Sequence, residues 1–539
     1  MSWLASDIAE RNPYTSDFVL NVCRIVALIK AVRAGGRHLV VVDERQLGRA
    51  IALCCRRAMV TVFWRDRWLS RVRSIQAGLR NHLMYLRRWT HERRALLRHW
   101  CELGSSKDSD LLLLSWFDGT GMTGNDVTKT DRFLGQLPGW LRNAGFRPAW
   151  LVNPITSVCS IEEIAAEVER KAAFQPMIVM GALVGFRTLL RAYWRLLMMP
   201  LAVRRRFKVA MVDLSPLTRW ALARELMSPR LVQAAVYCDL ARALKRRGMR
   251  PTALIYPFEN QPWEKAMLAG FRRDLPQTVL FGVHHAPFDR NLIGCHPSRG
   301  QWKDGTVPDV LCAIGEEFRD RLIASGAPPS RVVVGGALRY PSIRVMEQTR
   351  ISRETNEPLQ VFAACSMDFD EAFELSFKAI VATAGISQMR LLLGLHPMVS
   401  SDFRRRIRER VGMLLGCHHA EFVEGGVAKW LPKFDILVYD SSSAVFEAVA
   451  CGIPAVHVGS ECGLDLDVMS GRGVLKCRSA MDLRAQIRRL LDDHELRRVC
   501  IADARAYLQC NFSEPQADAW INWISKIVGG RRRSIGIAQ

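Results

Sequence analysis

Short apolar runs alternate along this chain with longer segments whose apolar residues recur every three or four positions. The runs have the length of buried strands, and the longer segments have the spacing of amphipathic helices. Strands that alternate with helices form mostly parallel sheets, because each helix carries the chain back to the edge where the next strand begins. The pattern therefore predicts an α/β fold. In the first part of the chain the expected strands are residues 37–44, 110–117, the end of the segment 130–154, 206–215, 250–260 and 276–287.

A second series of strands and helices follows the first. Since 539 residues exceed what one hydrophobic core can hold, we expect more than one domain. The predicted bounds are 1–305 for an N-terminal Rossmann-like domain, 306–512 for a C-terminal Rossmann-like domain, and 513–539 for a crossing helix with a basic tail. The polar segment 347–359 is expected to be a surface loop. The expected strands of the second domain are residues 331–336, 359–365, 388–397, 420–426, 434–440 and 454–459.

Two basic amphipathic insertions, at about 60–104 and 175–208, interrupt the predicted N-terminal domain. Between Arg65 and Arg98 the first carries ten arginines and two acidic residues, interleaved with Trp and Leu. In the second, arginines recur every four residues and so form one stripe of a helix. This stripe consists of Arg187, Arg191 and Arg195.

The apolar run 177–186 in the second insertion is about half as long as a membrane-spanning helix. An arginine at the centre of a bilayer costs roughly 2.5–3.5 kcal/mol, so a spanning helix is disfavoured. We expect both insertions to lie flat on a membrane, with apolar side chains in the lipid and arginines toward anionic headgroups. The alternative is that they are amphipathic helices packed on the protein itself.

Net charge and cysteine content narrow the class of protein. The formal charge is +23, from 76 Lys and Arg against 53 Asp and Glu. Such an excess indicates an anionic partner, which could be nucleic acid, an acidic membrane or a phosphorylated substrate. The 15 cysteines form no CxxC pair, so a structural zinc site is not expected. Scattered cysteines and a polar N-terminal segment predict a reducing cytoplasm.

Polar residues follow two of the predicted strands in the second domain. His396 ends the run 388–397, and a triple serine lies between the run 434–440 and a helical segment. In an open parallel sheet the carboxyl ends of the strands border the crevice where ligands bind. Hydroxyls, backbone N–H groups and an imidazole suit a phosphate, whereas a simple helix cap needs one serine. The serines are Ser441, Ser442 and Ser443.

Glu447 lies one helical turn beyond the serines, where its carboxylate could accept a hydrogen bond from a sugar hydroxyl. The alternative is a solvated helix glutamate. The segments LGLHP, ending at Pro397, and YDSSSAVFEAVACGIPAVHV, at 439–458, resemble the C-terminal domain of bacterial GT-B glycosyltransferases of surface polysaccharide synthesis. They are similar to the His-Pro and Ser-Ser motifs of sialyltransferases and Kdo transferases, and to CDP-glycerol glycerophosphotransferases. The resemblance covers roughly residues 250–480.

The resemblance implies a GT-B fold, in which the C-terminal domain binds a nucleotide-activated sugar and the N-terminal domain binds the acceptor. His396 and Ser441 to Ser443 would hold the donor phosphate, and Glu447 the ribose or sugar. The implied reaction is transfer of a CMP-activated acidic sugar, such as Kdo or a nonulosonic acid, to a lipid-linked or polymeric glycan. No metal and no cofactor are expected beyond the nucleotide-sugar substrate, and the enzyme would be peripheral on the inner face of the plasma membrane.

This chain departs from the resembled group at two points. Gly394 and Leu395 replace the usual basic residue before His-Pro, and the acidic-acidic-Gly motif is reduced to Asp118-Gly119. The expected general base is Glu259 at the end of the run 250–260. Asp118 is the second candidate for this role.

Other residues at strand ends complete the predicted site. Glu264 is a third candidate base, although it lies where a helix should already have begun. His284 and His285 end the run 276–287, and one of them is expected to line the cleft. Arg339 could reach a donor phosphate or carboxylate, with a surface salt bridge as the alternative. The alternative functions are a CDP-glycerol or UDP-sugar transferase, a nucleic-acid-binding protein, and an inactive GT-B scaffold.

Overall fold

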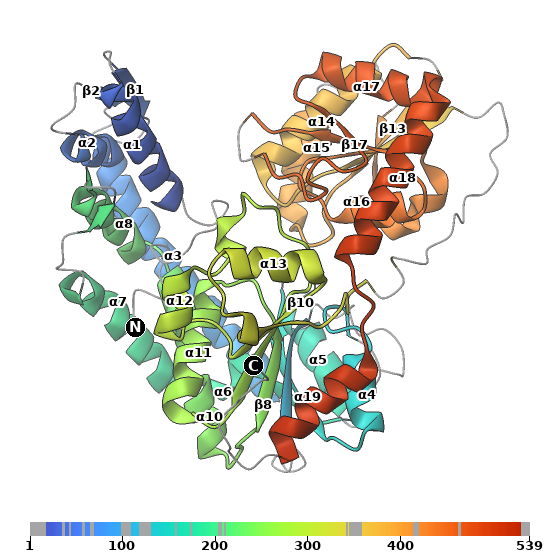
Figure 1. Cartoon of the computed structure of the whole chain (residues 1–539). Coiled ribbons are helices and arrows are strands. Elements are labelled where there is room, and N and C mark those ends of the chain that lie inside the picture. The colour runs from blue at the N-terminus through green and yellow to red at the C-terminus, as the bar shows by residue number, and fades with distance from the viewer. Residues whose placement is uncertain are drawn as a thin grey trace.

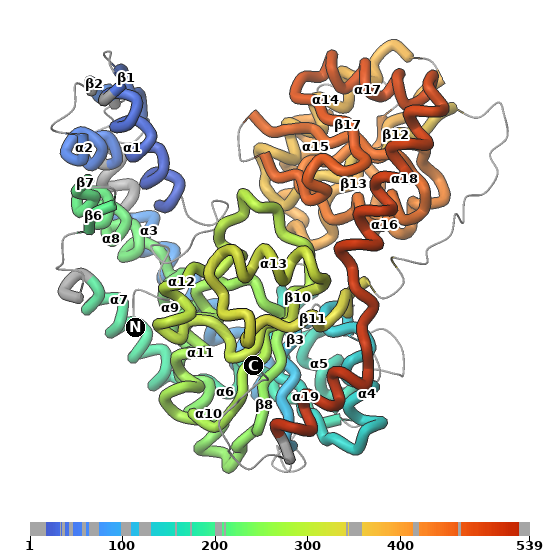
Figure 2. Tube along the Cα trace, in the orientation of Figure 1, coloured from blue at the N-terminus to red at the C-terminus, as the bar shows by residue number. Residues whose placement is uncertain are grey.

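The computed structural model shows two α/β lobes with a helical extension on the N-terminal lobe (Figures 1 and 2). It describes residues 18–34, 38–42, 45–55, 60–64, 69–98, 109–117, 131–156, 159–172, 175–202, 207–209, 212–340, 343, 358–386, 388–412, 420–461 and 465–529. Each lobe is built on one parallel sheet. The predicted α/β fold with two Rossmann-like domains, the GT-B architecture, is therefore confirmed.

The N-terminal sheet has seven parallel strands in the order β11-β10-β9-β8-β3-β4-β5. Helices cover both faces, so its strands are continuous apolar runs, and all four leucines at 111–114 are fully buried. Leu112 and Leu114 face a core shared with α10 and α11, whereas Leu111 and Leu113 face a core shared with α4 and α5. The strands are β3 (Leu111–Phe117), β4 (Pro148–Pro154), β5 (Met177–Val179), β8 (Ala253–Pro257), β9 (Val279–Val283), β10 (Val310–Ala313) and β11 (Val332–Val334). The helices are α4 (Leu137–Asn143), α5 (Ile161–Ala172), α6 (Met180–Leu183), α9 (Arg230–Ala235), α10 (Leu240–Arg246), α11 (Pro262–Asp274), α12 (Arg299–Asp304) and α13 (Glu316–Ala324).

The C-terminal sheet has six parallel strands in the order β14-β13-β12-β15-β16-β17. Helices again cover both faces, with α14, α15 and α17 on one and α16 and α18 on the other. The strands are β12 (Leu359–Ala364), β13 (Met389–Gly394), β14 (Ala420–Val423), β15 (Ile436–Tyr439), β16 (Ala455–Val458) and β17 (Val474–Cys477). The helices are α14 (Phe369–Thr383), α15 (Ser401–Gly412), α16 (Ala444–Ala450), α17 (Ala480–Asp492) and α18 (His494–Asn511).

The division between the sheets falls later in the chain than the predicted boundary at 305/306. Val310 of β10 pairs with Phe281 of β9, and Leu311 pairs with Val332 of β11, so β10, α13 and β11 extend the N-terminal sheet. The C-terminal sheet begins with β12. The predicted boundary was wrong because β10 and β11 bury their apolar residues by pairing, in turn, with the free edge of β9. Most of the predicted surface loop 347–359 lies outside the described residues.

Two expected strands do not join the large sheets. Residues 38–42 form β1 (His38–Val42), which pairs with β2 (Val60–Trp64) in a separate parallel pair. In the segment 206–215, β6 (Lys208–Val209) and β7 (Val212–Asp213) form a short antiparallel pair. These strands pack with three helices around a small core of their own, at the far end of the extension (Figure 1). The helices are α1 (Phe18–Arg33), α2 (Arg45–Cys54) and α8 (Ser215–Leu226).

The two basic insertions form long helices, α3 (Leu69–Arg98) and α7 (Phe186–Ala202), which pack on the protein. The expected orientation of α7 is wrong for two of its three arginines. Arg191 and Arg195 turn inward to the buried carboxylate of Asp239, at 2.8 and 3.6 Å, because a buried carboxylate attracts nearby guanidinium groups. No helix in the described segments is long and apolar enough to cross a membrane.

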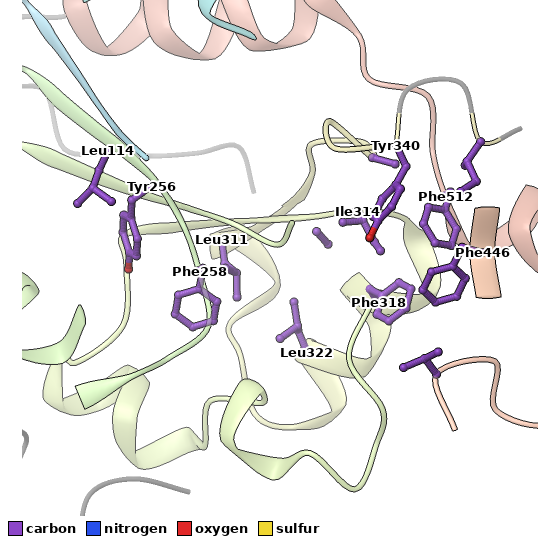
Figure 3. Packing of buried hydrophobic residues seen from close by; sticks show 14 of the residues in the cluster. Leu114, Tyr256, Phe258, Leu311, Ile314, Phe318, Leu322, Tyr340, Phe446 and Phe512 are labelled. Atoms are coloured by element: carbon purple, nitrogen blue, oxygen red, sulfur yellow. The ribbon is translucent and has the colours of Figure 1, made fainter. Parts of the chain in front are cut away.

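Aromatic packing joins the two lobes at their base (Figure 3). The ring of Tyr340 lies 6.3 Å from Phe446 and 5.7 Å from Phe512, with Phe446 and Phe512 5.1 Å apart. The last helix, α19 (Ala517–Gly529), returns to the N-terminal lobe, where Trp520 Nε1 donates to Gly335 O at 2.8 Å. These contacts fix how the carboxyl ends of the two sheets face each other.

Candidate functional site

The strand order places a topological switch point in each sheet. In the N-terminal sheet the connections diverge between β3 and β8, and in the C-terminal sheet between β12 and β15. Open α/β sheets bind ligands at such points, because the loops there separate and leave a crevice. Glu259 follows β8, and Ser366 and Asp440 follow β12 and β15. Asp118 follows β3 but lies outside the described residues.

Glu259 and His285 form a pair at the N-terminal switch point. His285 Nε2 lies 3.3 Å from Glu259 Oε1, and Gln261 Nε2 donates to Glu259 Oε2. The carboxylate is one-quarter exposed, whereas the imidazole is buried against Trp116 and Phe133, with ring centroids 5.5 and 5.3 Å away. Burial lowers the pKa of His285, so the ring is neutral and its Nε2–H donates to the carboxylate. Glu259 is thereby oriented with one face toward solvent.

Glu264 and His284 occupy structural positions instead. The Glu264 carboxylate accepts the backbone N–H groups of Glu259, Asn260 and Gln261 at 3.1 Å each, as part of the capping box of α11. Burial and the nearby Glu259 charge raise its pKa. His284 is buried between Phe288 and Phe318, and within the described structure neither ring nitrogen makes a hydrogen bond.

His396 lies at the carboxyl end of β13 and is held in one tautomer. The backbone N–H of Met398 donates to its Nδ1 at 3.2 Å, so the proton of the neutral ring sits on Nε2. Burial, together with the charges of Arg132, Arg339 and Arg404, lowers the pKa of His396 to about 4. The ring is therefore a neutral hydrogen-bond donor near pH 7 rather than a general acid.

The triple serine forms the turn between β15 and α16. Ser443 is the N-cap residue of α16, yet its hydroxyl caps no backbone N–H group. Ser442 Oγ accepts the Ala444 N–H at a long 3.4 Å, and Ser441 Oγ donates to Asp440 Oδ1 at 3.4 Å. Capping thus engages these hydroxyls weakly, and they remain available to a ligand.

Glu447 lies in α16, and within the described structure its carboxylate accepts no hydrogen bond. Burial raises its pKa, and the charges of Arg339 and Arg132 oppose this rise. Both arginines belong to the N-terminal lobe, whereas Glu447 and His396 belong to the C-terminal lobe. Charges of the two lobes therefore interact across the space between them at these four side chains.

Arg132 and Arg339 bring positive charge to His396 from the N-terminal lobe. Arg339 stacks over Phe133 and Tyr340, and Arg132 stacks over Phe133 and reaches Met398 Sδ at 3.8 Å. Arg132 was not predicted from the sequence. The signal for Arg132 in the sequence was its position, directly after the polar segment 118–131.

The structure explains why positions 394 and 395 carry no basic residue. A Cβ atom on Gly394 would lie 2.3 Å from the ring of Phe362, and Leu395 is buried in the core of the C-terminal sheet. Neither position can direct a long cationic side chain between the lobes.

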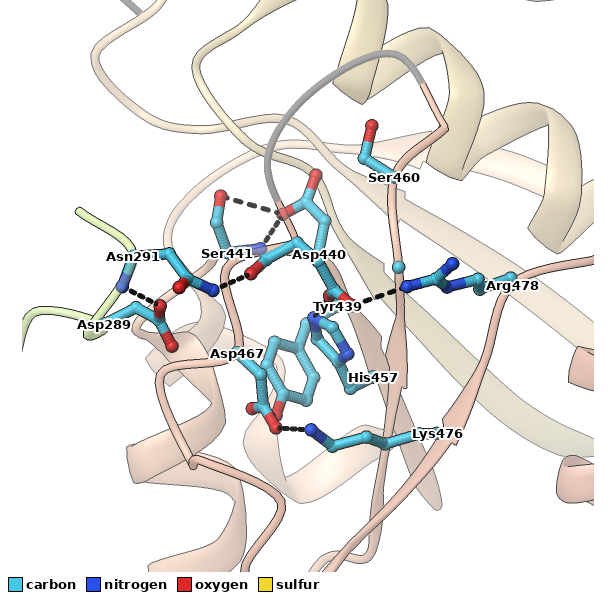
Figure 4. Close-up of polar contacts among 12 residues, drawn as sticks. Asp289, Asn291, Tyr439, Asp440, Ser441, His457, Ser460, Asp467, Lys476 and Arg478 are labelled. Atoms are coloured by element: carbon cyan, nitrogen blue, oxygen red, sulfur yellow. Dashed lines mark hydrogen bonds and ion pairs between the residues drawn. The ribbon is translucent and has the colours of Figure 1, made fainter. Parts of the chain in front are cut away.

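A buried polar network supports the serine turn (Figure 4). Asp440 accepts the backbone N–H groups of Ser441 and Ser366, the latter at 3.3 Å, and burial raises its pKa to about 6. Tyr439 donates to Asp467 Oδ1 at 2.8 Å, and Lys476 lies 2.8 Å from Asp467 Oδ2. The sequence reasoning missed Asp440, although it directly precedes the serines.

A cavity of about 390 Å³ lies between the lobes beside this network. Asp289 and Asn291 line it from the N-terminal lobe, and Asp467 and Lys476 line it from the C-terminal lobe. Asn291 Nδ2 donates to Asp465 O at 3.0 Å and so bridges the lobes. Within the described structure, no group of three or more His, Cys, Asp or Glu residues could hold a metal ion.

No family model and no curated protein sequence matches this chain. Three similar solved structures illustrate the comparison. A putative UDP-N-acetylglucosamine 2-epimerase from Listeria monocytogenes is 12% identical, with a TM-score of 0.48 over 78% of this chain and 96% of that one. The S. aureus MnaA–UDP structure is 12% identical, with a TM-score of 0.46 over 78% and 97%. The α,α-trehalose 6-phosphate synthase from Burkholderia multivorans is 11% identical, with a TM-score of 0.45 over 79% and 100%.

Proposed function

We propose that this chain is a metal-independent, nucleotide-sugar-dependent glycosyltransferase of bacterial surface polysaccharide synthesis. One observation carries the proposal. Arg132 and Arg339 of the N-terminal lobe act on His396 and Glu447 of the C-terminal lobe, the serine turn follows β15 of the same sheet as His396, and an oriented carboxylate, Glu259, lies on the N-terminal side. The arginines, the histidine and the serine turn are suited to bind the phosphate of a donor, and the carboxylate is suited to act as a general base.

In the proposed reaction an acceptor hydroxyl attacks the anomeric carbon of the donor, and the bond from that carbon to the phosphate oxygen breaks. Glu259 takes the hydroxyl proton, while His285 holds the other face of the carboxylate. Arg132, Arg339 and the Nε2–H of His396 stabilise the negative charge that develops on the departing nucleotide. Direct displacement of this kind inverts the anomeric centre.

The proposed donor is a CMP-activated acidic sugar such as Kdo or a nonulosonic acid, with a UDP-sugar or CDP-glycerol as the alternative. The two arginines support either donor, because a CMP-sugar carries a phosphate and a carboxylate and a UDP-sugar carries a diphosphate. Guanidinium groups bind all of these anions, often through two parallel hydrogen bonds. The donor requires no further cofactor.

The proposed acceptor is a lipid-linked or polymeric glycan at the inner face of the plasma membrane, where the enzyme would be peripheral. The exposed apolar side chains of α3 and α7 support a membrane contact, since both helices belong to the lobe assigned to the acceptor.

A donor screen tests the proposal. Purified protein is incubated with CMP-, CDP-, UDP- and GDP-sugars, and released nucleotide is measured alongside thermal stabilisation by each nucleotide. We expect one nucleotide class to stabilise and be released, and His396→Ala to slow its release by roughly 100-fold. The matched control is His494→Ala, because His494 is exposed on α18. If the His396 variant is as fast as the parent protein, the proposed catalytic site is wrong.

A further inference from the structure

A second cavity, remote from the switch points, lies among α3, the start of α7 and α10. Its volume is about 290 Å³, close to the lower end of the range for small-molecule sites of roughly 300–1,000 Å³. Its lining contains six arginines and one acidic residue, Asp239. The arginines are Arg93, Arg187, Arg191, Arg242, Arg246 and Arg247.

Asp239 cannot neutralise this lining, because its carboxylate is already shared. Arg191 lies 2.8 Å from it and Arg242 lies 3.9 Å from it, and two further arginines outside the lining approach within 3.6 Å. Arg187 and Arg246 are exposed and form no ion pair within the described structure. The cavity therefore holds a large uncompensated positive charge.

An exposed apolar stripe on α7 begins at the edge of the same cavity. Phe186 lines the cavity and is 61% exposed, and three further residues on its face of the helix are 53–64% exposed. Residues spaced by four and eleven positions lie on one side of an α-helix, so the stripe is continuous. The three residues are Leu190, Trp194 and Leu197. Large apolar side chains exposed together mark a contact surface.

We propose that this cavity binds the phosphate of a membrane lipid, while the α7 stripe rests among the acyl chains. Arginine guanidinium groups can donate paired hydrogen bonds to phosphate oxygens, and the apolar side chains beside them can pack against the acyl chains of the same lipid. The stripe favours a lipid over a nucleic acid, because Leu190 and Leu197 place aliphatic side chains beside its two aromatic rings, and acyl chains pack against all four side chains whereas bases stack only on the rings. The inference names the lipid group that would be bound in the membrane contact of the proposed function, and it rests on that proposed function.

The test uses the full chain and vesicles of phosphatidylcholine, alone or mixed with phosphatidylglycerol. We expect binding to the mixed vesicles only, and Arg187→Ala with Arg246→Ala to lower it roughly 30-fold, since each arginine contributes on the order of fivefold near an anionic surface. The charge-matched control is Arg488→Ala with Arg489→Ala, on an exposed face of α17. Leu190→Ser with Trp194→Ser should lower binding without changing the cavity.

Three outcomes would overturn the inference. Equal binding to both kinds of vesicle would remove the role of charge, and equal binding by the cavity variant and the parent would remove the role of these arginines. Cavity-dependent binding of inorganic pyrophosphate or single-stranded DNA without vesicle binding would assign another anion. Nucleotide stabilisation, measured without vesicles, should be the same in the parent and the cavity variant, so that failure of the donor site is recognised separately.

Discussion

The neutral His396 ring makes the stability of the protein depend on pH in a way that one substitution can isolate. His396→Asn removes the titrating group but leaves an amide oxygen where Nδ1 accepts the Met398 N–H. In the unfolded chain His396 gains a proton below its ordinary pKa of 6.5, whereas in the folded protein it stays neutral until the pH nears about 4. The unfolded state therefore binds more protons between these values, and stability falls as the pH decreases from 6.5 to 4.

The magnitude follows from the two pKa values. The interval between 6.5 and about 4 corresponds to about 3.4 kcal/mol once both states are protonated. At about pH 5 the loss relative to neutral pH is about 2 kcal/mol. The parent protein should lose this amount of unfolding free energy, and His396→Asn should not.

Urea unfolding followed by circular dichroism, at about pH 7.5 and about pH 5, measures the difference between the two proteins. Other buried histidines titrate equally in both and cancel in the comparison. His494→Asn, on exposed α18, should behave as the parent protein. If His396→Asn loses as much stability as the parent, the ring is protonated normally and the two arginines do not face it.

Three further predictions concern the same site and its support. Glu259→Gln should lower the rate of sugar transfer by roughly 10²–10⁴-fold while nucleotide binding, measured by calorimetry, is unchanged. Arg339→Gln should weaken nucleotide binding by roughly tenfold to 100-fold, since a charged hydrogen bond contributes about 1.5–3 kcal/mol, and an unchanged dissociation constant would contradict this role. Gly394→Ala should destabilise the protein by about 1–3 kcal/mol, because its Cβ would overlap the Phe362 ring; unaltered thermal unfolding would show that this ring moves freely.

The strands, and the polar residues at their carboxyl ends, could be predicted from the sequence because they depend on the local alternation of apolar and polar positions. Buried parallel strands are short apolar runs, and their carboxyl ends carry the polar residues, so His396 and the serine turn could be located without a structure. Glu259 and His285 were proposed for the same reason, but their 3.3 Å contact depends on β8 and β9 being neighbours.

Features that depend on contacts distant in sequence could not be predicted. The domain boundary was wrong because β10 resembles any buried strand until its pairing with β9 is known. Arg132 acts on His396 only through the docking of the two lobes. The inward turn of Arg191 depends on Asp239, which lies two helices later in the chain.

The return of α19 means that the two lobes are not consecutive pieces of the polypeptide. Trp520 and Ile524 are fully buried in the core of the N-terminal sheet, and Ser513 exchanges backbone hydrogen bonds of 2.8 and 2.9 Å with Ala337 and Ile314. A fragment that stops before β12 would lack Trp520 and Ile524, and it would expose the apolar surface of the N-terminal sheet that these two side chains cover. Dissection of this protein into separately produced halves therefore requires a permuted chain, in which α19 is joined to the N-terminal lobe.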